Sequence, residues 1–169
     1  EERISPCIED FDSLGAYSFI NLREGWAICV SEPAAGFQAK TVLHTTDGGR
    51  TWQLIPQTQF IGQNRQTEIL SPGYFGSFFA LDAQQLGCWM GRDDMGEMYR
   101  SSDGGYTWTQ AKSEPLMNVD KGRFVNSDFG YVIANPFEDE QPDHFLFVTS
   151  NGGETWKQIF PSTSSKPHA

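Results

Sequence analysis

The chain has 169 residues, which is enough for one domain with a substantial core. Its formal net charge is −10, and an acidic surface repels the phosphates of nucleic acids and of anionic membranes, so neither is expected as a partner. It has no apolar stretch long enough for a membrane-spanning helix.

Cysteine and histidine are too few and too scattered for a zinc site. The three cysteines, Cys7, Cys29 and Cys88, allow at most one internal disulfide and leave one thiol over. Cys29 and Cys88 lie in apolar runs, which predicts that both are core residues. The redox compartment is not fixed by this pattern.

An eight-residue pattern occurs three times along the chain. It reads TTDGGRTW at 45–52, SSDGGYTW at 101–108 and TSNGGETW at 149–156. A glycine followed by an apolar run precedes each copy: GWAI at 25–28, GCWM at 87–90 and GYVI at 130–133. The copies are about 50 residues apart, a period that indicates propeller blades or a similar array.

In chain order, each repeat predicts four short strands and no helix. The strands of the first repeat are 16–21, 25–31, 40–46 and 51–56, and those of the second are 75–81, 86–91, 96–102 and 107–111. Those of the third are 122–126, 130–134, 144–150 and 155–160. The fold class is therefore all-β, with three four-stranded antiparallel blades at about 15–56, 74–111 and 122–160. Residues 57–72 and 112–121 are expected to be connectors, and 161–169 a loose tail.

The eight-residue pattern suits a hairpin turn between the third and fourth strands. Its Asp accepts hydrogen bonds from turn N–H groups, its second Gly takes a positive φ, and its Trp covers the hairpin. We favour this structural role over a cation or sugar site. The residues concerned are Asp47, Gly49, Thr51, Trp52, Asp103, Gly105, Thr107, Trp108, Asn151, Gly153, Thr155 and Trp156. Asn151 replaces Asp in the third copy and can still accept through its carbonyl.

This pattern resembles the Asp box, also called the bacterial neuraminidase repeat, of a β-propeller superfamily. The run LHTTDGGRTW at 43–52, after the Gly-Trp-Ala strand, is most similar to the photosystem II stability/assembly factor-like branch. The resemblance implies a non-catalytic propeller that holds partner polypeptides. It does not carry over the photosystem itself, because many bacterial relatives have the same repeats without any link to photosynthesis.

Sialidases and some endoglucanases share the Asp box and place their catalysis elsewhere. A sialidase requires three arginines for the substrate carboxylate, the first within an aromatic-Arg-Ile/Leu-Pro motif. The nearest string here is Glu2-Arg3-Ile4-Ser5-Pro6, which lacks the aromatic residue and inserts Ser before Pro. No catalytic residue is assigned, and a carbohydrate-active enzyme, or a fragment of one, remains the alternative function.

Three blades cannot close a ring, since propellers have four to eight. Two copies could form a six-bladed ring, the chain could be a piece of a longer propeller, or connectors could cover the ends. The homodimer is the favoured arrangement.

The loops between second and third strands lie at the end opposite the Asp boxes and carry acidic residues. The candidates are Asp93, Asp94, Glu138, Asp139, Glu140 and Asp143, with Glu32 in the first loop. Such a face suits a basic protein segment, and its carboxylates would also suit Ca²⁺, although no Ca²⁺-loop spacing is present. We therefore expect an exported, extracellular or periplasmic binding or assembly module with a protein or glycan partner and no required cofactor.

Overall fold

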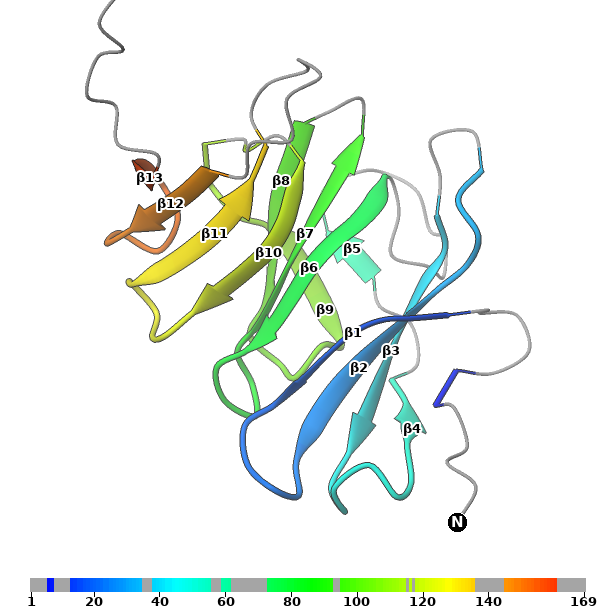
Figure 1. Ribbon diagram of the computed structural model, residues 1–169. Helices are drawn as coiled ribbons and strands as arrows, with labels where there is room; N and C mark the ends of the chain where they lie inside the picture. Colours follow the sequence, from blue (N-terminus) through cyan, green and yellow to red (C-terminus); the bar gives the residue numbers. More distant parts are fainter. Residues whose placement is uncertain are drawn as a thin grey trace, which may run out of the picture.

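The computed structural model describes residues 6–7, 13–34, 38–55, 59–61, 73–92, 95–114, 116, 118–135 and 145–160. Within these residues the secondary structure is β-strand and turn, and no helix is long and apolar enough to cross a membrane. The strands form three sheets that fan out side by side, and the four main strands of each sheet are antiparallel and in sequential order (Figure 1). The predicted all-β class with three blades is confirmed.

Blade 1 is the sheet nearest the N-terminus. Its strands are β1 (Ser13–Phe19), β2 (Gly25–Val30), β3 (Lys40–Thr45) and β4 (Gln53–Leu54). All six residues of β2 are buried, as expected of a strand covered on both faces. The innermost strand begins at Ser13, three residues before the predicted start, and the outermost strand is shorter than predicted.

Blade 2 contains one strand that the sequence did not predict. Its main strands are β6 (Tyr74–Ala80), β7 (Leu86–Arg92), β8 (Met95–Ser101) and β9 (Thr107–Gln110). β5 (Gln59–Ile61), within the segment expected to be a plain connector, pairs in parallel with β9 and makes a fifth strand. The prediction of a strandless connector over 57–72 is therefore wrong at 59–61.

Blade 3 ends the array. Its strands are β10 (Val119–Phe124), β11 (Gly130–Ala134), β12 (Phe145–Thr149) and β13 (Lys157–Phe160). The first of them begins at Val119, within the region 112–121 that was expected to be a connector. β1, β6 and β10 are the innermost strands of the three blades and lie at the front in Figure 1.

Two apolar layers hold the blades together. The layer between blades 1 and 2 includes Trp26, Ile28, Phe78 and Trp108. The layer between blades 2 and 3 is more aromatic, and its buried core includes Phe79, Trp89, Phe124 and Phe147. Burying aromatic side chains contributes most of the stability of such contacts, at about 25 cal/mol per Å² of apolar surface removed from water.

The sequence alignment of the glycine-led runs is wrong by one residue in blade 2. Strand pairing joins the first residue of each box to one residue of the second strand: Thr45 to Gly25, Ser101 to Leu86 and Thr149 to Gly130. Leu86, and not Gly87, is thus the counterpart of Gly25. Because side chains alternate between faces, this shift turns Trp89 toward blade 3.

Lys40 joins blade 1 to blade 2 from a buried position, with 1% of its surface exposed. Its ammonium group donates hydrogen bonds to the carbonyl oxygens of Gln38, at 2.7 Å, and Gly73, just before β6. The Gln38 side chain also accepts from the Phe75 N–H at 2.9 Å. Burial lowers the pKa of Lys40 from 10.5 to about 8, against a smaller opposing effect of Cys88.

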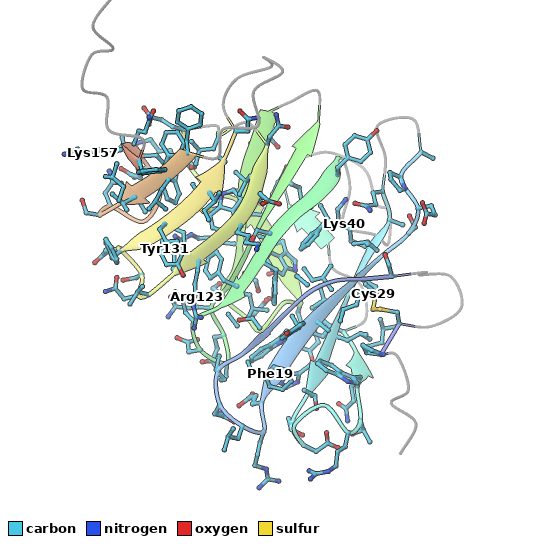
Figure 2. All side chains as sticks on the ribbon, in the orientation of Figure 1. Phe19, Cys29, Lys40, Arg123, Tyr131 and Lys157 are labelled. Carbon is cyan, nitrogen blue, oxygen red and sulfur yellow. A yellow bond between two sulfur atoms is a disulfide. The ribbon has the colours of Figure 1, made fainter. Side chains whose placement is uncertain are left out.

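The outward face of blade 1 is covered by the chain itself. Cys7 forms a disulfide with Cys29, and this bond holds Cys7 against the sheet (Figure 2). Ala27, Cys29 and Leu43 are at most 3% exposed there, and Cys7 and Trp52 pack against them. Cys88 is the remaining thiol, and it is buried.

Candidate functional site

The three Asp boxes lie at one end of the blades, between the third and fourth strand of each sheet. In the first box, one carboxylate oxygen of Asp47 accepts from the backbone N–H groups of Arg50 and Thr51, both at 2.9 Å. The other accepts from the Thr51 hydroxyl at 2.7 Å. The box is therefore a closed local network that uses the acceptors of its own aspartate.

The other two boxes repeat this network with one chemical difference. Asp103 accepts from the Thr107 N–H at 2.9 Å and from the Thr107 hydroxyl at 2.6 Å. Asn151 accepts from the Thr155 N–H at 3.1 Å and donates its amide to the Thr155 hydroxyl at 3.0 Å. In the third box the hydroxyl of the threonine is therefore the acceptor, whereas in the other two boxes it is the donor, and the turn is the same.

Both glycines of each box have positive φ, where the sequence singled out only the second. The second glycines are Gly49, Gly105 and Gly153, at 83°, 99° and 85°, and the first are Gly48, Gly104 and Gly152, at 78°, 76° and 69°. The N–H of Gly48 donates to the Arg23 carbonyl at 2.7 Å, so the box is tied to the hairpin between β1 and β2.

That hairpin contains a second repeated turn that sequence reasoning missed. The side-chain oxygen of Asn21 accepts from the N–H groups of Arg23 and Glu24, as in an Asx turn. Asp82 and Asn126 make the same two bonds in blades 2 and 3. The signal was present, because an Asn or Asp stands four residues before each register-equivalent Gly25, Leu86 and Gly130.

Hydrogen bonding shifts the two box aspartates toward the ionised form. For Asp47, the N–H and then the hydroxyl of Thr51 hold the pKa well below its ordinary value. For Asp103, burial raises the pKa, but the bonds from Thr107, Ser101 and Tyr106 together outweigh it and lower the pKa.

We expect Asp103→Ala to lower the free energy of unfolding by about 1–2 kcal/mol at pH 7, because turn N–H groups lose their acceptor. The folded pKa lies below the ordinary 3.8, so the carboxylate contributes fully above that value and less as pH falls below it. Urea denaturation at pH 7 and pH 3 should show the cost shrinking in acid. Asn151→Ala is the matched control, and its cost should not depend on pH.

A groove lies at the opposite end of the blades, between blades 2 and 3. Its volume is about 630 Å³, within the range of ligand pockets. Apolar groups form much of the lining, with Phe75, Trp89, Met90 and Val119 among them, and Tyr74 adds an aromatic ring. The polar side chains of the lining are Asn118, Asp120 and Asn135.

Direct contacts between the innermost strands hold the groove in shape. The Ser77 hydroxyl on β6 accepts from the Gly122 N–H on β10 at 2.8 Å, and donates to the Gly122 carbonyl at 3.3 Å. Gly76 lies close to β10, since a Cβ there would stand 2.7 Å from the Val119 carbonyl oxygen. Bulkier residues at these positions would separate the two blades and widen the groove.

Asn118 at the rim of the groove has a left-handed backbone, with φ of 47°. Asn tolerates this region better than most residues, and such backbones are enriched at binding sites. The Asn118 carbonyl accepts from the Asn135 N–H at 3.2 Å, and its amide donates to the Asn135 carbonyl at 3.4 Å. These bonds connect the residue before β10 to the residue after β11 at the rim of the groove.

The acidic loop residues named from the sequence all lie outside the described residues: Asp93, Asp94, Glu138, Asp139, Glu140 and Asp143. Glu32 is exposed in the loop after β2. Across the described parts of the chain, no group of three or more His, Cys, Asp or Glu side chains could hold a metal ion. The groove, to which Asp120 contributes a carboxylate, was not found from the sequence.

The BNR/Asp-box repeat family model matches residues 43–54, the end of β3 through the first box to β4. No curated protein matches the chain. Among solved structures, one described as "YCF48 bound to D1 peptide" matches with a TM-score of 0.54 and 19% identity, over 89% of this chain and 43% of that one. This chain therefore spans less than half of that structure's chain.

A second solved structure is described as a "new family of Polysaccharide lyase PL25-Ulvanlyase". It matches with a TM-score of 0.41 and 16% identity, over 80% of this chain and 31% of that one. This likeness is too low to support an argument about fold or activity. The chain thus carries a match to the Asp-box repeat, as its sequence predicts, within antiparallel sheets of propeller type.

Proposed function

We propose that this chain is a non-catalytic binding module that holds an extended polypeptide segment in the groove between blades 2 and 3. The observation that carries the proposal is the groove itself, a recess of about 630 Å³ whose lining mixes apolar groups with the polar side chains of Asn118, Asp120 and Asn135. Its place at the end opposite the Asp boxes agrees with the face favoured from the sequence.

The chemistry of the groove selects the kind of segment. Tyr74, which is 43% exposed, and the half-buried Phe75 offer aromatic surface for one side chain of the ligand, above the buried Trp89 and Met90. Asp120 is exposed at the same groove and offers a carboxylate to a Lys or Arg beside it. A chain with a net charge of −10 also attracts a basic segment over longer distances.

The comparison with YCF48 gives this proposal independent support. That protein has the same fold, and its structure is described as holding the D1 peptide. Only the ligand class, a polypeptide, is proposed for this chain, and neither D1 nor the position of its site is. A protein partner is thus favoured over a glycan, and location outside the cytoplasm remains part of the proposal.

The test is binding to an array of extended peptides that carry one aromatic or aliphatic residue next to Lys or Arg, with neutral glycans on the same array. We expect peptide binding, weakened about tenfold by Asp120→Lys because the charge pair becomes a repulsion. Asp128→Lys is the matched control, since Asp128 is exposed on the same blade at the Asp-box end. Unchanged peptide affinity in Asp120→Lys, or turnover of a glycan, would contradict the proposal.

A further inference from the structure

The groove lies where blades 2 and 3 meet, and the junction of blades 1 and 2 shows what fills the same place there. Leu86 is the counterpart of Gly25, so further along the same strands Gly91 is the counterpart of Val30. Val30 packs in the apolar layer between blades 1 and 2, and Gly91 lines the groove between blades 2 and 3. The two junctions can therefore be compared residue by residue.

Cross-strand pairs extend this correspondence to the third strands. Val30 pairs with Lys40 in blade 1, and Gly91 pairs with Gly96 in blade 2. The first pair places two side chains between blades 1 and 2, where both residues are at most 6% exposed. The second pair places no side chain between blades 2 and 3, and both glycines line the groove. The groove is thus open at the place where the preceding junction holds a valine and a lysine.

The segment 38–40, Gln-Ala-Lys, acts at the first junction as an internal ligand of blade 2 (Figure 2). Its lysine ammonium donates to the carbonyl of Gly73, just before β6, while the alkyl stem is buried between the blades. Its glutamine side chain accepts from the N–H of Phe75 at 2.9 Å. Blade 2 therefore holds a lysine and an amide carbonyl of the segment that lies against it.

Blade 3 presents a corresponding backbone donor to the groove. Val119 is the counterpart of Phe75, because each stands directly before the register shift in the innermost strand of its blade. The Phe75 N–H points away from its own sheet to the Gln38 side chain. By this correspondence the Val119 N–H points toward the groove that Val119 lines, where a carbonyl oxygen of a ligand can accept from it.

The rim of the groove carries acceptors for a cation. Asn118 uses its side-chain nitrogen for the bond to the Asn135 carbonyl, which leaves its side-chain oxygen as the acceptor that it offers. The carboxylate of Asp120 is exposed at the same groove. One amide oxygen and one carboxylate are suitable partners for an ammonium group, and the carboxylate makes such hydrogen bonds charge-assisted.

We infer that the groove binds a lysine side chain of the partner polypeptide, in the place that Lys40 holds at the first junction. The alkyl stem lies over the paired glycines, and the ammonium donates to the side-chain oxygens of Asn118 and Asp120. A carbonyl oxygen of the same segment accepts from the Val119 N–H. The inference rests on the proposed function and narrows its ligand from any basic segment to one that contains lysine.

The shape of the acceptors selects lysine among side chains of similar length. An ammonium is a compact charge whose three N–H groups can reach acceptors in different directions, whereas a guanidinium requires two parallel acceptors in one plane. An uncharged side chain of the same length fills the groove but forms no charge-assisted hydrogen bond. The preceding junction shows that a lysine fits between two blades of this chain.

The test measures binding of the full chain to a peptide with the sequence of residues 37–41, Phe-Gln-Ala-Lys-Thr, blocked at both ends. Three analogues replace its lysine with norleucine, Nε-acetyl-lysine or arginine. In isothermal titration calorimetry we expect the lysine peptide to bind about tenfold more tightly than the norleucine and acetyl-lysine peptides, which lose the charge-assisted bonds. The arginine peptide should also bind more weakly, by a smaller factor.

Gly91→Val tests the position of the bound lysine. Valine restores the side chain of the counterpart Val30 and occupies the groove, so the affinity for the lysine peptide should fall about tenfold. Position 96 is less suitable, because the Leu116 carbonyl stands where a side chain at Gly96 would begin. Thr109→Val is the matched control, since Thr109 is exposed on β9 of the same blade and away from the groove lining.

The outcomes separate this inference from the proposed function. Norleucine or arginine peptides that bind as tightly as the lysine peptide would overturn the lysine site alone. A Gly91→Val chain that is folded by circular dichroism and keeps its full affinity would do the same. Absence of binding by all four peptides, while other extended peptides bind, also counts against the lysine site only, whereas absence of any peptide binding overturns both. Should Gly91→Val fail to fold, the four peptides on the wild-type chain decide.

Discussion

Replacing Trp108 with alanine is expected to lower the free energy of unfolding by about 3–5 kcal/mol, the usual cost of removing a fully buried aromatic side chain. Trp108 is 0% exposed and belongs to the apolar layer between blades 1 and 2. Its indole N–H also donates to the Gly105 carbonyl at 3.0 Å. The substitution therefore leaves both a cavity between two sheets and an unpaired carbonyl.

Trp52→Ala is the matched control for this prediction. Trp52 has the same place in the first Asp box, but it is only half-buried, on the outward face of blade 1. Its loss should cost about half as much, because less apolar surface leaves water at that site. Urea denaturation of the two variants measures the difference, and equal losses would show that packing between blades does not set the cost.

The architecture could be predicted because the boxes recur. Each box contains an Asp or Asn, two glycines, a Thr and a Trp whose local chemistry dictates the same turn wherever it appears. Three such turns at a period of about 50 residues leave room for four strands between them; blades 1 and 3 show that count, and blade 2 adds β5 as a fifth strand.

The register within a blade could not be read from the same residues. Gly87 looks like the counterpart of Gly25 because each stands next to a phenylalanine ring in the folded sheet, Phe79 and Phe19. The Gly87–Phe79 pair and the Gly25–Phe19 pair lie on opposite faces of their blades. A shift of one residue along a strand moves a side chain from one face of the sheet to the other. Only pairing with the box residue at the end of the third strand fixes the answer.

The groove and the pairing of Cys7 with Cys29 could not be predicted for a different reason. Asp120 and Tyr74 are more than 40 residues apart, and nothing in either neighbourhood indicates that β6 and β10 lie side by side. The cysteine count allowed one disulfide and gave no preference among the three pairings. Contacts between blades depend on how sheets pack, which a pattern of single residues does not encode.

Lys40 gives the second large effect, a rise in stability with pH. Its pKa is about 8 in the folded chain and 10.5 as the ordinary value, so between these limits the unfolded chain binds a proton that the folded chain has lost. Unfolding then takes up a proton, and the free energy of unfolding increases as pH rises. Each pH unit of separation is worth about 1.4 kcal/mol, so the gain approaches about 3 kcal/mol by pH 10.5.

Two other buried groups lower the free energy of unfolding as pH rises, so the effect of Lys40 has to be measured against a variant that keeps both of them. Burial raises the pKa of Cys88 above its ordinary 9.0 and that of Tyr99 above its ordinary 10.0, so each costs stability once its unfolded form ionises. Lys40→Met leaves Cys88 and Tyr99 in place and removes the amino group that titrates at position 40. The difference in unfolding free energy between wild type and Lys40→Met, from urea titrations at steps from pH 7.5 to 10.5, should therefore grow in favour of the wild type. A difference that stays constant over that range would mean that the buried lysine keeps its ordinary pKa, and that its bonds to Gln38 and Gly73 fully compensate for its loss of water.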